Sequence, residues 1–271
     1  MSDLKNAKLK SQTNVFVRRK WIYTLTFSGI LALFLLSVNV TNYSLTDGAL
    51  AIPRAVVWMV QNLVPTEDSW ARLPTILNRL TETALVSVSV TVCAAICAFL
   101  FSLLGTRTMK VNVVINKIVR MIAAIFRSIP EVVWAILLLF SFGQNILTGF
   151  FALFFTTFGM LTRTFIEAID EVSASCVEAL QATGATPLQI VFQGVVPSSI
   201  SVVISWVLYM IETNIRAATL IGLLTGTGIG ALFGLYYSRL DYGSAALVVF
   251  ATAILVVTIE LVSNLIRKVI L

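Results

Sequence analysis

Long apolar segments dominate this chain of 271 residues and restrict what it can fold into. Apolar residues make up 58% of the sequence, charged residues 12%, and the mean hydropathy is +0.94. A helix needs about 20 predominantly apolar residues to cross the hydrocarbon core of a bilayer. The segments that approach this requirement are 21–40, 80–104, 118–141, 146–162, 198–221 and 243–265. The sequence therefore predicts an all-α polytopic membrane protein with six transmembrane helices.

The basic residues predict how these helices are oriented. The arm at 1–20 carries six basic residues, and the segment 105–128 carries Arg107, Lys110, Lys117, Arg120 and Arg127 without an acidic residue. The C-terminus also ends with basic residues. Cytoplasmic segments of membrane proteins carry an excess of Lys and Arg. Both termini are therefore predicted to be cytoplasmic, and the net charge of +6 indicates topology, so no nucleic-acid partner is expected.

The same reading divides the chain into four parts. They are a cytoplasmic basic arm at 1–20, a first transmembrane helix at 21–40, an extracytoplasmic connector at 41–79, and a core at 80–271 with five transmembrane helices. The core includes a polar hairpin at 163–197, which six spans with cytoplasmic termini place in the cytoplasm. Within the connector, 49–64 is open to two interpretations, an amphipathic helix lying on the membrane surface or a plain linker.

Several chemistries are excluded by what the chain lacks. It has no histidine, so neither a Ser-His-Asp triad nor a histidine metal site can form. No G-x-x-x-x-G-K-[ST] motif occurs, so the chain has no P-loop of its own. The run Gly226-Thr-Gly228-Ile-Gly230 follows an apolar segment rather than a strand, which argues against a dinucleotide-binding loop. We therefore expect no enzymatic activity, no metal and no cofactor bound by this chain itself.

Within the polar hairpin, capping residues predict two short helices joined by a turn. Ser175 and Glu178 have the spacing of a capping box for a first helix. Gly184 stands where that helix should end, because glycine adopts the left-handed conformation at little cost. Thr186 then caps a second helix whose first position is a proline, and Pro197 is expected to end that second helix.

Polar residues in the fifth apolar segment are candidates for the translocation pathway. Glu212 and Arg216 lie one helical turn apart, so they can form an ion pair along one face. The alternative is that Arg216 lines the route and favours an anionic substrate, since intramembrane charges often have a function. Asn214 points away from this pair at helical spacing.

The polar hairpin resembles the EAA loop of ABC importer permeases. That pattern is EAA, three residues, glycine, nine residues and I-x-L-P. It stands here as Glu178-Ala179-Leu180, then Gly184, then Gly194-Val195-Val196-Pro197. The spacing is kept, while Leu180 replaces an alanine and Gly194 replaces the isoleucine.

Four segments extend the resemblance to the permeases of phosphonate ABC transporters. They are RSIPEVVWA at 127–135, EAIDE at 167–171, EALQATGA at 178–185 and LYMIETNIRAAT at 208–219. The resemblance implies a type I ABC importer with a MetI-like fold in a bacterial inner membrane. It also implies that the polar hairpin contacts the ATPase through Glu178, Ala179, Leu180, Gly184, Ala185, Pro187 and Pro197.

The implied partners are ATPase subunits that bind ATP and Mg, an extracytoplasmic substrate-binding protein and a second permease copy, identical or different. The implied cargo is phosphonate or a related phosphorus oxyanion. Two alternatives are kept. One is an ABC permease for another small solute, such as the amino acid methionine. The other is a stand-alone secondary transporter, a class that typically has inverted repeats and broken helices at the membrane midplane.

Overall fold

The computed structural model describes residues 2–107 and 112–270 and divides the chain into two compact units, Met1–Gln61 and Asn62–Leu271. Lys110 lies outside the described residues. The first unit contains α1 (Ser2–Val40) and most of α2 (Leu45–Asn62). Within α1, the segment Phe16–Val40 is long and apolar enough to cross a membrane. The helical form of α2 fits the first interpretation of 49–64, while its place on a membrane stays a prediction.

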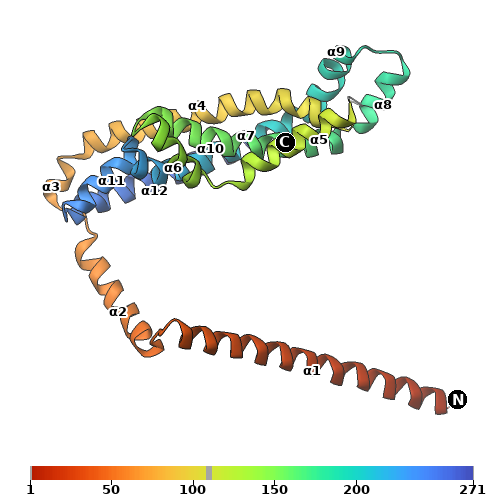
Figure 1. The fold of residues 1–271 in the computed structure, drawn as a ribbon, viewed down its shortest axis with the longest axis horizontal. Coiled ribbons are helices and arrows are strands. Elements are labelled where there is room, and N and C mark those ends of the chain that lie inside the picture. Colours follow the sequence, from red (N-terminus) through yellow and green to blue (C-terminus); the bar gives the residue numbers. More distant parts are fainter. Residues whose placement is uncertain (1, 108–111, 271) are drawn as a thin grey trace. The chain divides into compact units, whose positions relative to one another are not determined.

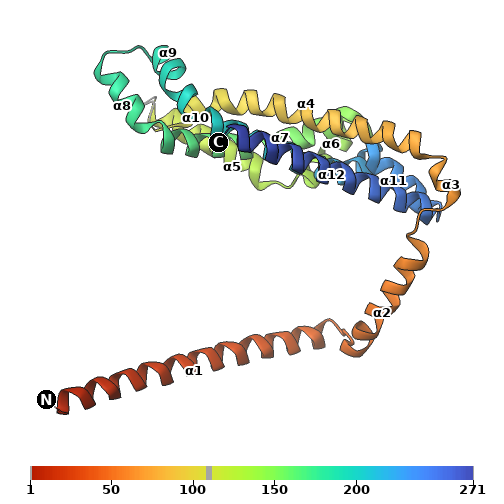
Figure 2. The same ribbon diagram turned by 180° about the vertical axis from the view of Figure 1, so that it is seen from behind.

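The second unit is a helical bundle that begins inside the predicted connector, at Asn62. Its long helices lie side by side along the bundle in both views (Figures 1 and 2). They are α4 (Leu73–Gly105), α7 (Ile146–Val172), α10 (Val196–Thr225) and α12 (Tyr242–Ile270). Each of the four belongs to a segment that meets the length and hydropathy needed to span a membrane. These segments exceed the predicted spans: α7 continues from 162 to Val172, and the segment Pro187–Thr225 begins eleven residues before 198.

The predicted span 118–141 is wrong as a single straight helix. It consists of α5 (Val113–Ser128) and α6 (Glu131–Phe142), which are bent by 88° relative to each other. The cause lies in Pro130, because a proline disfavours the helical conformation of the residue before it. Ile129 accordingly has φ −94° and ψ 119°, which is extended. The described residues thus hold five candidate spans, or six when this bent pair is counted as one.

The sequence predicts that Pro197 ends the second helix of the polar hairpin, and this prediction is wrong. The short helix α9 (Pro187–Ile190) passes into a π-helical segment, η1 (Val191–Val195), and then directly into α10. Pro197 lies in the first turn of α10, where a proline is tolerated because the N–H groups there have no partner within an α-helix. The second arm of the polar hairpin is therefore continuous with the following span.

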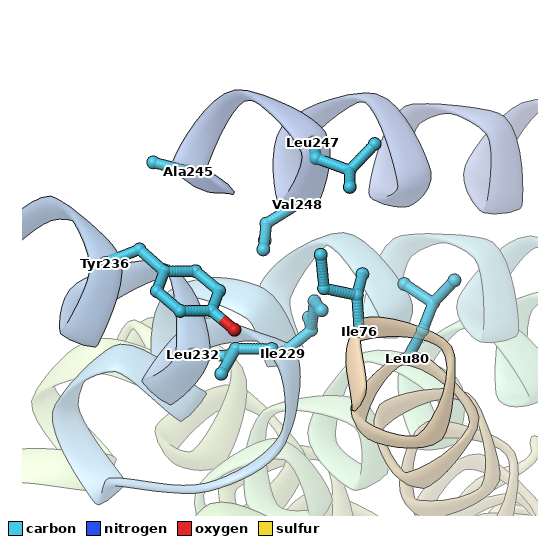
Figure 3. Close-up of a cluster of buried hydrophobic side chains, with 8 residues drawn as sticks. All are labelled: Ile76, Leu80, Ile229, Leu232, Tyr236, Ala245, Leu247 and Val248. Carbon is cyan, nitrogen blue, oxygen red and sulfur yellow. The ribbon is translucent and has the colours of Figure 1, made fainter. Parts of the chain in front are cut away.

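Two short helices were not predicted. The helix α3 (Glu67–Trp70) precedes α4, and α11 (Gly228–Ser238) joins α10 to α12. α11 packs into the bundle through a cluster of buried apolar side chains that α4 and α12 complete (Figure 3). The residues of the cluster are Ile76, Leu80, Ile229, Leu232, Tyr236, Ala245, Leu247 and Val248. This cluster fixes one end of the bundle, while the polar hairpin lies at the other (Figures 1 and 2).

Candidate functional site

The turn of the polar hairpin is a Schellman motif that closes α8 (Ala174–Ala182). Gly184 has φ +78°, the left-handed conformation predicted from its place after the helix. Its N–H donates to the carbonyl oxygen of Gln181 at 3.1 Å, and the N–H of Ala185 donates to that of Leu180 at 3.1 Å. These two bonds satisfy carbonyl groups that the end of a helix leaves without partners. The turn is therefore fixed by the backbone and depends on a glycine.

The second arm begins at the predicted capping box. The N–H of Gln189 donates to Thr186 Oγ1 at 3.4 Å, and the N–H of Thr186 donates to Gln189 Oε1 at 2.8 Å. Pro187 occupies the first helical position, where its lack of an N–H costs nothing. Both predictions are confirmed, so each side of the turn at Gly184 is held by its own hydrogen bonds.

The predicted cap at Ser175 is wrong. α8 begins at Ala174, after a break of one residue, Ser173, which itself has a right-handed helical conformation. The Ser173 hydroxyl donates to the carbonyl oxygen of Ile169 at 2.5 Å, and the Ser173 carbonyl accepts from the N–H of Val177 at 2.9 Å. An N-cap needs a residue outside the helical conformation, and the chain has none here. α7 thus passes almost directly into α8.

One side of the polar hairpin is buried and the other is exposed. Its buried side packs on the end of α7 through a cluster that consists of Ile169, Val177, Ile190 and Val195. Half-buried side chains from α4, Phe99 and Leu103, cover the same cluster. On the exposed side lie Glu178, Ala179, Leu188 and Phe192. Two of these are large apolar residues, Leu188 being 72% and Phe192 69% exposed. Exposed apolar and acidic side chains on a folded hairpin are suited to binding another protein.

The two departures from the EAA pattern meet inside the polar hairpin. Gly194 is buried in the π-helical segment, and a Cβ at that position would lie 2.8 Å from Cδ1 of Leu180. That separation is shorter than van der Waals contact, so a larger residue at 194 would force the end of the Leu180 side chain to move. The two substitutions compensate each other in volume and keep the arms close together.

At the base of the polar hairpin, an ion pair joins three helices. Arg120 on α5 contacts Asp170 on α7 at 2.9 Å, and its Nε also donates to the carbonyl oxygen of Gly105 at 3.0 Å. The other carboxylate oxygen of Asp170 accepts from the backbone N–H of Arg107 at 2.8 Å. The end of α4, the middle of α5 and the end of α7 are thereby tied together, three residues before Ser173. The sequence did not predict this ion pair, because a basic residue beside an apolar segment indicates only the orientation of that segment.

In α10, the ion pair predicted from spacing is confirmed. Arg216 Nη2 lies 3.1 Å from Glu212 Oε1. The Glu212 side chain is only 11% exposed, whereas that of Arg216 is 53% exposed. The carboxylate of the pair is therefore largely buried, while its guanidinium is exposed. Such a group can still donate hydrogen bonds to an anion, since a guanidinium carries five N–H donors.

Asn214 links three spans through a buried network. It is 3% exposed, and its Nδ2 lies 2.8 Å from Thr91 Oγ1 on α4 and 2.9 Å from Thr157 Oγ1 on α7. The side chain faces the bundle interior, away from Arg216. A role in the translocation pathway stays a prediction. The two threonines were missed, because single threonines in apolar segments give no signal in the sequence.

The described residues contain no group of three or more His, Cys, Asp or Glu side chains that could hold a metal ion. Cys93, Cys97 and Cys176 are free thiols. The notable groups of this chain are thus the polar hairpin, its base and the polar residues of α10.

Comparison with known proteins gives a family and several relatives. Residues 91–271, more than half of the chain, match the family described as binding-protein-dependent transport system inner membrane component. The phosphate-import permease protein PhnE of Mycolicibacterium smegmatis is 28% identical over 222 residues, which are 80% of this chain and 40% of the relative. The phosphite transport system permease protein PtxC of Stutzerimonas stutzeri is 27% identical over 192 residues, 71% of this chain and 70% of the relative.

The fold is also similar to that of a solved transporter. An inward-facing structure of the MetNI methionine ABC transporter superposes with a TM-score of 0.59 at 18% identity, covering 73% of this chain and 98% of the solved chain. At that identity the similarity concerns the fold alone, which is the predicted MetI-like permease fold. The chain spans less than half the length of the mycobacterial relative. From the family match, this chain belongs to the inner membrane components of binding-protein-dependent transport systems, a family of ABC importer permeases.

Proposed function

We propose that this permease imports phosphonate or a related phosphorus oxyanion across a bacterial inner membrane, with both of its termini in the cytoplasm. Two relatives support this class of cargo, because one is named for phosphate import and the other for phosphite transport. The basic residues that precede the first span and end the last one support the orientation.

The observation that carries the mechanism is the two-sided polar hairpin. Its apolar interior joins it to α4 and α7, while Glu178, Ala179, Leu188 and Phe192 face outward. We infer that this exposed side docks on an ATPase subunit, which binds ATP and Mg and supplies the free energy of hydrolysis. Among the residues carried over from the EAA pattern, Gly184 and Pro187 shape the turn, while Leu180 and Ala185 pack inside it.

Movement of the polar hairpin would be transmitted directly to the spans. α8 follows α7 after the single residue Ser173, and the second arm runs through the π-helical segment and Pro197 into α10. The ion pair of Arg120 with Asp170 adds α5 to the same assembly. A rigid-body displacement driven by the ATPase would therefore change the packing of four helices together, as alternating access requires.

Arg216 is the residue that we assign to recognition of the anionic cargo. Its guanidinium is half-exposed within an apolar helix, while its partner Glu212 is covered. Guanidinium groups bind phosphorus oxyanions through two parallel hydrogen bonds. An extracytoplasmic binding protein would deliver this cargo, and a second permease copy would complete the pore.

Co-purification in mild detergent, with mass-spectrometric stoichiometry, tests the class of transporter. We expect an equimolar ATPase subunit and a second permease copy, identical or different. Recovery of this chain alone, under conditions that keep a known ABC importer whole, would instead favour a stand-alone secondary transporter.

Uptake by proteoliposomes that contain the whole complex and its binding protein tests the cargo. Methylphosphonate, phosphite, phosphate and methionine should be offered separately at equal concentration. We expect ATP-dependent uptake of a phosphorus oxyanion, which Arg216→Gln lowers and Arg239→Gln, at an exposed position between α11 and α12, leaves unchanged. ATP-dependent uptake of methionine alone would keep the importer class and refute the cargo.

A further inference from the structure

Arg267, in the last turn of α12, has guanidinium nitrogens without partners. Its Nε and Nη2 are buried and make no hydrogen bond with any described residue, while Nη1 donates to Asn264 Oδ1 at 3.2 Å. None of the ion pairs formed among the described residues includes Arg267. Leaving a buried cationic donor unpaired is costly. The geometry therefore calls for acceptor oxygens that residues 2–107 and 112–270 do not supply.

Two open cavities meet at this arginine. One, of about 370 Å³, is lined by Met160, Ser205, Trp206 and Tyr209 together with Arg267. The other, of about 640 Å³, is lined by Leu261, Asn264, Leu265 and Lys268 together with Arg267. The walls are mostly apolar, and two cations stand among them. A ligand that fits both cavities combines a negatively charged group with an apolar body.

The position along the bundle agrees with the boundary between membrane and water. In both views the C-terminus of α12 lies part-way along the bundle, short of the polar hairpin (Figures 1 and 2). Trp206 and Tyr209, which pack edge to face at 5.6 Å, border the same cavity. Trp and Tyr gather at membrane interfaces, as do Lys and Arg at the ends of spans. These residue types predict that the Arg267 guanidinium lies at the level of the lipid headgroups.

We propose that Arg267 and Lys268 bind the phosphate of an anionic phospholipid. The Arg267 guanidinium, whose Nε and Nη2 are covered by the protein, turns outward so that the phosphate oxygens accept hydrogen bonds from it, and an acyl chain lies along Leu261 and Leu265, which are 60% and 63% exposed. Basic pockets beside transmembrane helices recognise anionic headgroups in this way. The apolar walls favour a lipid over a free phosphorus oxyanion, which would leave them in contact with water.

The first test measures lipid that stays with the purified protein. The full chain, in the assembly with which it purifies, is extracted from vesicles of equal parts phosphatidylglycerol and phosphatidylcholine, and the retained lipids are quantified by mass spectrometry. Arg267→Gln should lower retained phosphatidylglycerol by about fivefold, the effect of one lost cation at a membrane surface. Arg239→Gln, which removes an exposed cation before α12, should leave it unchanged. Equal retention by the wild type and Arg267→Gln would overturn the proposal.

A second test needs no change at Arg267. Phospholipids with brominated acyl chains quench tryptophan fluorescence at short range, and Trp206 borders the cavity. The contribution of Trp206 to the quenching is the difference between the wild type and Trp206→Phe. This difference should be larger with brominated phosphatidylglycerol than with brominated phosphatidylcholine. Equal quenching by both lipids would contradict headgroup selection.

Inorganic phosphate and methylphosphonate, titrated in vesicles of phosphatidylcholine alone, distinguish the two sources of the anion. If either one changes Trp206 fluorescence in the wild type and not in Arg267→Gln, the site belongs to a free oxyanion and the lipid assignment is wrong. A titration that leaves Trp206 fluorescence unchanged, together with selective quenching by brominated phosphatidylglycerol, supports the assignment of the site to a lipid.

Discussion

Gly194 leaves room for the Leu180 side chain, and a larger residue at 194 would displace it. Gly194→Ile should therefore destabilise the polar hairpin by about 1–3 kcal/mol through overpacking. Leu180→Ala removes buried methyl groups and also destabilises, by less than the about 2–5 kcal/mol of a fully buried leucine. In the double variant, the added volume fills the space that was vacated. We expect a favourable coupling of about 0.5–3 kcal/mol, measured from thermal unfolding of the four proteins.

Gly29→Ile is a matched control for that cycle, since Gly29 lies in α1 with open space at its Cβ position. It should leave the unfolding temperature close to that of the wild type. Additive losses from the two substitutions in the polar hairpin would show that the contact does not determine its stability.

Asn214 should stabilise the bundle through its bonds to Thr91 and Thr157. Asn214→Leu keeps the volume of the side chain but removes its hydrogen bonds to both threonines. Since hydrogen bonds between transmembrane helices contribute about 0.6 kcal/mol on average and at most about 1.7, the loss should be about 1–3 kcal/mol. Thermal unfolding in detergent measures it, with Thr213→Val as the comparison, because the Thr213 hydroxyl bonds the carbonyl of Tyr209 in its own helix. An unchanged unfolding temperature in Asn214→Leu would contradict a stabilising network.

Asp241, in the turn between α11 and α12, should make this end of the bundle sensitive to acid. Burial raises the pKa of Asp241, but hydrogen bonds from Ser244 and the guanidinium of Arg72 outweigh it, so the pKa lies below its ordinary value. A carboxyl group with a lowered pKa stabilises the fold above its pKa in the unfolded chain. That contribution disappears as the pH falls through the lower pKa of the folded state.

Unfolding temperatures between pH 6 and pH 3 test whether the protein loses stability as Asp241 is protonated. The unfolding temperature of the wild type should fall more steeply toward acid than that of Asp241→Asn. Arg72→Gln should be intermediate, because this substitution removes only one of the groups that lower the pKa of Asp241. Parallel curves for the wild type and Asp241→Asn would refute the assignment.

At the scale of elements, the turn of the polar hairpin should decide coupling. Gly184→Val places a β-branched residue at φ +78°, a strain of about 1–2 kcal/mol for a residue other than glycine. We expect the spans to insert normally and the ATPase to hydrolyse ATP, while uptake is lost, because the docking surface no longer keeps its shape. Gly226→Val is the matched control, since Gly226 has φ +69° in the left-handed helical region and only ordinary contact distances to Gln144, but lies between α10 and α11. Normal uptake by Gly184→Val would refute the role of this turn.

The elements also explain what could be predicted from the sequence. Apolar length indicated the long helices, and the capping residues indicated the turn at Gly184, because both signals are local. The bend before Pro130 and the continuity through Pro197 were missed, because a proline stops a helix in one context and begins it in another. α11 was missed because eleven residues are too few to register as a span. The contacts of Asp170 and Asn214 depend on helices far apart in the sequence, which no local pattern can pair.

At the scale of the whole molecule, the ion pair of Arg120 with Asp170 should transmit motion to α5. Reversing one charge, as in Arg120→Asp, leaves two carboxylates facing each other and should lower uptake more than ATP hydrolysis. Restoring the opposite charges with Asp170→Arg should recover part of the uptake. The stability change should be small, about 1 kcal/mol, because the pair is partly exposed. If the double reversal transports no better than Arg120→Asp, the pair has no such role.

The nearly unbroken passage from α7 into α8 has a mechanical consequence. Met160 lies beside the end of α12, at the level of the aromatic and basic residues, and α7 continues for twelve residues to Val172. At 1.5 Å per residue these twelve residues extend about 18 Å, and the whole of α7 is about 40 Å long. A sideways shift of about 5 Å at the C-terminal end of α7, with its other end fixed, would tilt the helix by about 7°. If the polar hairpin docks on an ATPase as proposed, a small displacement at the tip of α7 would thus become a rotation of the whole helix.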